Sequence, residues 1–75
     1  MGLTVIKVIV VDQKSKQGIS GVGVKKYGDK DYTKTNKQGI VNLTTENSDI
    51  AIYVNGVTQY DGSVSECPNP LIVEK

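Results

Sequence analysis

The stretch GISGVGVKKYGDKDYTKTNKQGIVNL, residues 18–43, decides the fold predicted for this chain. Its glycines stand where a strand must turn, and alternating apolar residues begin directly after Gly21 and after Gly39. Successive side chains of a strand point to opposite faces, so this alternation is typical of strands with one face in a core. Gly21 and Gly23 would also allow another backbone to approach closely. The stretch therefore predicts β-structure and offers no catalytic motif.

The same pattern extends outward in both directions and predicts seven strands with no helix. The predicted strands are residues 4–12, 21–27, 31–35, 40–45, 49–55, 57–60 and 71–73. We expect the strands at 31–35 and 40–45 to form a hairpin around residues 36–39, and Asn55-Gly56 to close a second hairpin. Seven short strands in 75 residues predict an all-β chain, a small two-sheet sandwich with Greek-key connections that forms one domain over residues 1–75.

The strand order resembles that of the carboxypeptidase regulatory-like and transthyretin-like β-sandwich families. The resemblance is carried by the first strand, by the glycine-rich segment at 18–24 and by the T-x-T-x-x-x-G-x-x-x-L pattern at residues 33–43. It implies a fold of that kind and no activity. The purine-pathway hydrolase among these families depends on His and Arg residues and a C-terminal Tyr-Arg-Gly-Ser signature, whereas this chain has no His or Arg and ends LIVEK. The metallocarboxypeptidases carry their zinc on a separate domain.

The first strand is apolar on both faces. Ile6, Val8 and Val10 alternate with a second apolar set, Val5, Ile9 and Val11. A 75-residue domain buries only about 60% of the surface that its unfolded chain exposes, so its core is thin. We therefore expect the strand to be covered by a second sheet, by a neighbouring subunit or by both, and we take Val5, Ile9 and Val11 as candidate interface residues.

Charge and hydropathy exclude two classes of partner. All nine basic residues are lysines, and eight acidic residues leave a net charge of +1, so no basic stripe predicts nucleic-acid binding. No run approaches the roughly 18 apolar residues that cross a bilayer, and no cleavage site follows the first apolar run. We expect no membrane partner and a cytoplasmic or virion-associated location by default.

Catalytic chemistry is not expected. The chain has no histidine, which removes the commonest general base and metal ligand. Cys67 follows Glu66, whose charge opposes thiolate formation, and a single cysteine forms no internal disulfide. Asp29, Asp31 and Asp61 lack the spacing of a calcium loop. We predict no catalytic residue, no metal and no cofactor.

Four tyrosines supply the aromatic surface: Tyr27, Tyr32, Tyr53 and Tyr60. Tyr53 and Tyr60 flank the Asn55-Gly56 turn at separations that could set them across a hairpin, and we include both in the candidate interface. Tyrosines gathered outside would form a platform for a protein or a sugar ring. The alternative, which we favour, is that they cap the small core.

A third hypothesis concerns Lys7 and Asn69. Some bacterial surface sandwiches of related strand order form a spontaneous Lys–Asn isopeptide bond between the first and last strands. Lys7 lies within the first strand, and Asn69 precedes the last strand. Glu46 is the nearest candidate for the required acid, and an ordinary surface lysine is the simpler alternative.

These observations favour a non-enzymatic structural or interaction module. We expect it to bind a protein partner, a second copy of itself included, through its sheet faces or edge strands. The alternative is a carbohydrate or small-ligand module that uses exposed tyrosines. The size and the Lys-rich, Arg-free composition also suit an appendage of a phage particle or secretion spike, which is an analogy of fold and size alone.

Overall fold

A computed structural model describes residues 2–75 and has seven strands and one short 3-10 turn. The elements are β1 (Thr4–Val11), β2 (Gly23–Lys26), β3 (Thr33–Lys34), β4 (Ile40–Thr45), β5 (Asp49–Val54), β6 (Val57–Ser63), η1 (Val64–Glu66) and β7 (Leu71–Glu74). The predicted all-β composition and the number of strands are confirmed. Two strands are longer than predicted, since β6 continues to Ser63 and β7 to Glu74.

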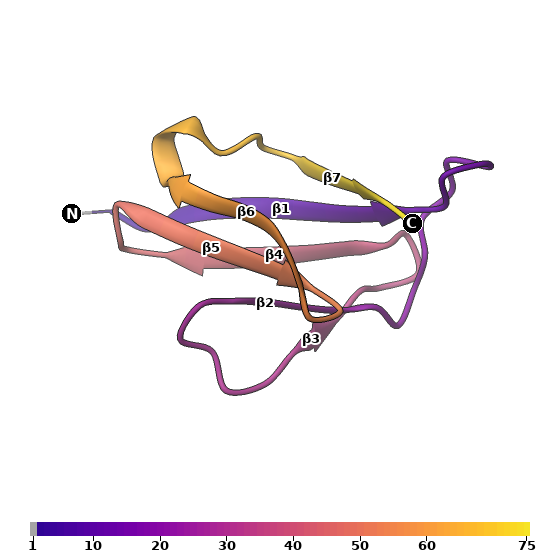
Figure 1. Ribbon diagram of the computed structural model, residues 1–75, viewed down its shortest axis with the longest axis horizontal. Helices are drawn as coiled ribbons and strands as arrows, with labels where there is room; N and C mark the ends of the chain where they lie inside the picture. Colours follow the sequence, from indigo (N-terminus) through magenta and orange to yellow (C-terminus); the bar gives the residue numbers. More distant parts are fainter. Residues whose placement is uncertain (1) are drawn as a thin grey trace.

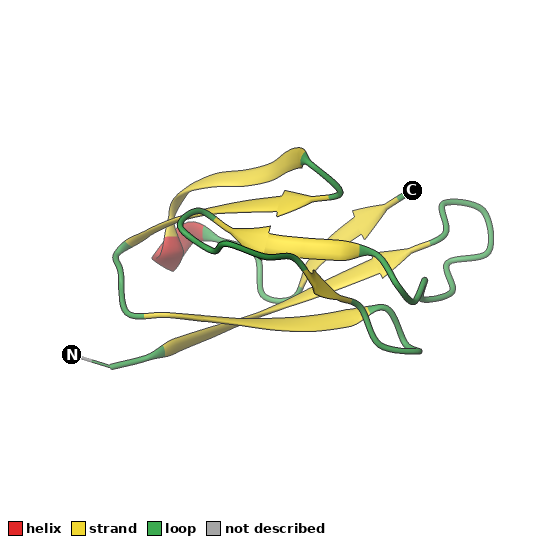
Figure 2. Ribbon diagram, turned by 90° about the horizontal axis from the view of Figure 1, so that it is seen from below, coloured by secondary structure: helices red, strands yellow, loops and turns green. Residues whose placement is uncertain are grey.

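The strands form two sheets that lie one above the other (Figures 1 and 2). The three-stranded sheet has the order β4-β1-β7, and the four-stranded sheet has the order β3-β2-β5-β6. In the first sheet, β1 pairs with β4 antiparallel and with β7 parallel. The pairs of the second sheet are all antiparallel. This arrangement is compatible with a small β-sandwich, 38 × 24 × 19 Å in extent.

The core lies between the sheets and is built from the alternating residues that the sequence predicts to face inward. β1 contributes Ile6, Val8 and Val10, and β5 contributes Ile50, Ile52 and Val54. Valines and leucines of the other strands complete the cluster: Val24, Val41, Leu43, Leu71 and Val73. Because β1, β4 and β5 each bury every second residue, the inward faces of these strands are confirmed.

The predicted hairpin between residues 31–35 and 40–45 is wrong. β3 pairs with β2, whereas β4 pairs with β1 in the other sheet, so the turn between them carries the chain from one sheet to the other. Thr35, which directly follows β3, is buried. Its Oγ1 donates to the carbonyl of Ile19 (2.6 Å) and accepts from the amide of Val22 (3.0 Å), and these bonds hold the start of the turn. The second predicted hairpin, β5–β6, is confirmed, and both Asn55 and Gly56 adopt positive φ there.

Close backbone approach occurs at Gly18 and Gly39 rather than at Gly21 and Gly23. A Cβ on Gly39, whose φ is +80°, would lie 2.3 Å from the carbonyl oxygen of Val10, and one on Gly18 would lie 1.9 Å from that of Gln38. At Gly23 a Cβ would instead meet the Tyr32 side chain, and at Gly21 it would meet open space. The β1–β2 loop therefore packs directly on the β3–β4 turn.

Candidate interaction surfaces

The first candidate surface is the outer face of the three-stranded sheet. The strand register aligns Ile40 of β4, Ile9 of β1 and Ile72 of β7 side by side, and we call these three residues the isoleucine row. Ile72 is 59% exposed, and Ile9 and Ile40 are half-buried. Their neighbours in sequence point inward, so the row lies on the side away from the four-stranded sheet.

The predicted interface residues of β1 lie on this same face. Val5 is 51% exposed, and Val11, like Ile9, is half-buried. The four-stranded sheet covers only the opposite side of β1, which carries Ile6, Val8 and Val10. The second sheet therefore covers one face of β1, and residues 2–75 leave the outer face to solvent. The expectation that a neighbouring subunit covers that outer face stays a prediction.

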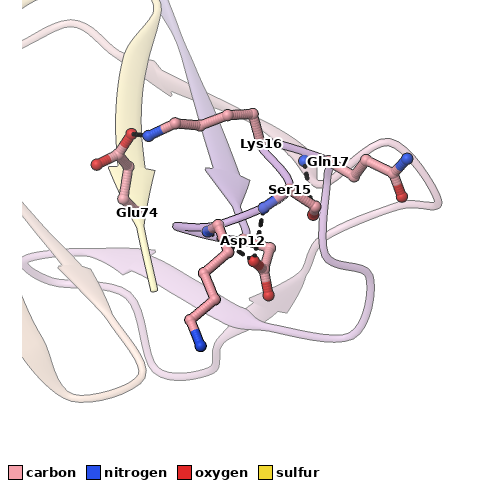
Figure 3. A network of polar contacts seen from close by, with 6 residues as sticks. Asp12, Ser15, Lys16, Gln17 and Glu74 are labelled. Atoms are coloured by element: carbon pink, nitrogen blue, oxygen red, sulfur yellow. Dashed lines mark hydrogen bonds and ion pairs between the residues drawn. The ribbon is translucent and has the colours of Figure 1, made fainter.

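Charged and polar side chains border the isoleucine row on both sides. Lys7 and Asn42 are paired in register on one side, and Glu74 is paired with Val11 on the other. Lys16, from the β1–β2 loop, forms an ion pair with Glu74 (Figure 3). On β1, Lys7 lies between Val5 and Ile9. The isoleucine row thus has a lysine on one side and the Lys16–Glu74 ion pair on the other.

The loop that supplies Lys16 is fixed by Asp12 (Figure 3). Its carboxylate accepts hydrogen bonds from the backbone amides of Lys14 (2.8 Å) and Ser15 (3.0 Å), and the Ser15 hydroxyl accepts one from the amide of Gln17. The bonds from the Ser15 and Lys14 amides lower the pKa of Asp12, because they stabilise its charged form. The carboxylate therefore keeps the loop folded over the end of β7.

Asn69 extends the pairing between β1 and β7. Its Oδ1 accepts a hydrogen bond from the amide of Lys7 (3.1 Å), and its Nδ2 donates one to the carbonyl of Val5 (2.9 Å). The Lys7–Asn69 isopeptide hypothesis stays untested. The amide that such a bond requires is held by the backbone of β1, and the Lys7 side chain is exposed.

The second candidate surface is a hollow on the outer face of the four-stranded sheet. Three tyrosines line it together with Lys25 and Gly28, namely Tyr27, Tyr32 and Tyr53. Its volume is about 320 Å³, which is at the small end of ligand pockets. Tyr27 is 78% exposed and Tyr32 is 43% exposed, and Lys25 Nζ lies 5.0 Å from the centroid of the Tyr32 ring. We call this site the tyrosine hollow.

Tyr60 does not belong to the tyrosine hollow. The hairpin register sets Tyr53 opposite Thr58, and one extra β6 residue, Gln59, then sets Tyr60 opposite Ile52, so the two tyrosines lie on opposite faces of the sheet. Tyr60 packs against the core, and its hydroxyl donates to the carbonyl of Ser63 (2.5 Å). Partial burial raises its pKa. The candidate interface residues therefore divide: three lie on the first surface, Tyr53 lies in the hollow, and Tyr60 caps the core.

Cys67 lies apart from both surfaces. It is half-buried, packs against the core and donates from Sγ to the carbonyl of Pro68 (3.5 Å). Burial raises the pKa of its thiol, which disfavours the reactive thiolate. Among residues 2–75 no three His, Cys, Asp or Glu side chains come together as metal ligands. In the same part of the chain, no helix has the length and apolar character to cross a membrane.

Sequence reasoning missed Ile40 and Ile72 on the first surface and Lys25 beside the tyrosines of the second. Alternation offers a signal for both isoleucines, because each directly adjoins an apolar residue of a predicted strand, Val41 after Ile40 and Leu71 before Ile72. Their alignment with Ile9 required the order of strands in the sheet, which no local pattern encodes.

Comparison of the chain with protein-family models, with curated proteins and with solved structures found no match.

Proposed function

We propose that this chain is a non-enzymatic structural or protein-interaction module that binds a protein partner through the outer face of its three-stranded sheet. The isoleucine row carries the proposal. Full burial of an aliphatic side chain of this size is worth about 1.5–3 kcal/mol relative to exposure, so a sheet that presents three aligned isoleucines, with Val5 and Val11 beside them, gains free energy when it is covered.

The border of the face also supports a protein partner. Protein interfaces combine an apolar centre with a polar, solvent-accessible rim. Here Lys7 and Asn42 border the isoleucine row on one side, and the Lys16–Glu74 ion pair borders it on the other. Charges at such a rim contribute orientation and association rate more than affinity.

The non-enzymatic part of the proposal is supported by the side chains at hand. The chain has no histidine, and its one thiol has a raised pKa. The acidic side chains of the described residues do not gather into a group that could bind a metal.

A photo-crosslinking residue at position 72 tests the proposed face. We expect benzoylphenylalanine at position 72, introduced in the cells that make the chain, to give one discrete protein adduct that excess wild-type chain competes away. The same residue at position 57 is the control, since Val57 is as exposed as Ile72 (60% against 59%) but lies on the other sheet. Equal adducts from both positions, or none from position 72, would reject the proposal.

A second candidate function, binding of a carbohydrate or another small ligand, is favoured by the tyrosine hollow. Exposed aromatic rings beside a lysine offer stacking surfaces and a polar donor. On this hypothesis we expect a ligand found on a glycan array to bind roughly two- to tenfold more weakly to Tyr27→Ala, since an aromatic stacking contact is worth roughly 0.5–1.5 kcal/mol. Tyr60→Phe keeps the hollow intact and should bind normally. An array without signal, or equal losses in both variants, would exclude the hollow as a ligand site.

We also propose that the fold belongs with the transthyretin-like and carboxypeptidase regulatory-like sandwiches and that its connections are of Greek-key type. The support is the division of seven strands into sheets of three and four and the passage of the chain between sheets from β3 to β4.

A further inference from the structure

We infer that the partner on the outer face of the three-stranded sheet is a second copy of this chain. The two copies pack face to face about a two-fold axis that runs along the isoleucine row, so that their β1 strands are antiparallel. This inference rests on the proposed function, because it names the occupant of the same face.

Self-complementarity supports a second copy. A two-fold interface brings each patch onto itself, so residues on the axis meet their own equivalents. With the axis along the row, Ile9, Ile40 and Ile72 of one copy pack on the same residues of the other. Two sheets that pack in this way keep their strands within about 30° of each other and about 10 Å apart, which isoleucine side chains from both sides fill.

The charges at the border select this axis over its alternative. An axis along β1 would place Lys7 directly over Lys7 of the second copy, and like charges in an interface cost free energy. An axis along the isoleucine row instead places Lys7 over Val11 of the second copy, next to Glu74, which is the register partner of Val11. Each Glu74 then lies between Lys16 of its own chain and Lys7 of the other. Of these two arrangements, the antiparallel one is therefore the one in which the charges are complementary.

The size of the face is that of a weak interface. The three strands of this face have 8, 6 and 4 residues, so strand rise and spacing give it a projected area of roughly 290 Å². A stable interface buries about 800 Å² of accessible surface per partner, so this one belongs with weak, transient contacts. Because area alone does not set affinity, the dimer is sought at the high chain concentration that a weak interface requires.

Sedimentation equilibrium of matched variants tests the inference. At about 1 mM, the wild-type chain should approach twice its mass of 8.1 kDa, and Ile72→Lys should weaken dimerisation at least about tenfold, because the interface would bury two like charges near the axis. Val57→Lys makes the same change at an equally exposed position outside the face and should dimerise as the wild type does. A monomeric wild type at that concentration, or equal effects of both variants, would overturn the second copy as partner.

Charge exchange tests the orientation. Lys7→Glu and Glu74→Lys should each weaken the dimer, and the double variant should restore it in part, because opposite charges again face each other across the axis while the lysine introduced at position 74 lies beside Lys16. Additive losses in the double variant would contradict the antiparallel arrangement. Circular dichroism of each variant checks that the fold is kept.

Failure of this inference can be told apart from failure of the proposed function. If the chain is monomeric and its position-72 crosslink captures a different protein, the interaction face is supported and the second copy is rejected as the partner. If the Ile72→Lys variant dimerises as the wild type does, and no crosslink is specific to position 72, both the interaction face and the second copy on it are rejected.

Discussion

Gly39→Ala is expected to destabilise the protein by about 3–5 kcal/mol, which is a large share of the stability of a chain of this length. The positive φ of Gly39 alone costs an alanine roughly 1–2 kcal/mol. The added methyl would also stand 2.3 Å from the carbonyl oxygen of Val10 and 2.8 Å from the amide of Ile19. These two groups are hydrogen-bonded to each other at 2.9 Å, and the Val10 amide donates to the Gly39 carbonyl at 2.8 Å. Any backbone shift that makes room for the methyl group therefore breaks these hydrogen bonds.

Gly28→Ala is the matched control for this prediction. Gly28 also has a positive φ, +98°, but a Cβ there meets nothing within 4 Å. The substitution should therefore cost only the free energy of placing an alanine at a positive φ. Urea unfolding followed by circular dichroism gives both free energies of unfolding. Equal losses in the two variants would show that the close approach at Gly39 contributes nothing.

Ile52→Ala is expected to cost about 2–5 kcal/mol, through lost burial and the cavity left in the core. Ile52 is completely buried on β5, and a chain of this length has a total stability of only about 4–11 kcal/mol. The substitution thus removes a large share of the stability.

Ile72→Ala makes the same chemical change on the outer face of β7, where the side chain is 59% exposed. It should change the free energy of unfolding by no more than about 0.5 kcal/mol when measured at low micromolar concentration, where the proposed dimer is dissociated. Similar losses at the two positions would contradict the division of the sheet into a buried and an outer face.

The inward faces of the strands were predictable from the sequence because the alternation is local. β1 and β5 show it in full, and the turn at Asn55-Gly56 carries the residues that a two-residue hairpin requires. These features depend only on side chains within a few residues of one another. They can therefore be predicted without knowing which strands pair.

Features that depend on pairing between distant strands were not predictable. Turn residues at 36–39 are compatible both with a hairpin and with a passage between sheets, and the buried hydrogen bonds of Thr35 decide for the passage. The separation of Tyr53 from Tyr60 follows from one irregular step in the β5–β6 ladder, which leaves no mark in composition. The glycines of residues 18–39 indicated that backbones approach closely in this region. Which glycines contact another backbone depends on how the loops around Gly18 and Gly39 fold against each other.

The parallel pairing of β1 with β7 gives the molecule a defined response to mechanical load. The start of β1 and the end of β7 lie toward opposite ends of the long axis (Figure 1), and the two strands are hydrogen-bonded neighbours. Tension between these two points pulls the strands past each other in shear, so the bonds of the ladder and the two Asn69 contacts bear the force together instead of opening one at a time. A domain held in this way resists extension through the rate at which that joint ruptures.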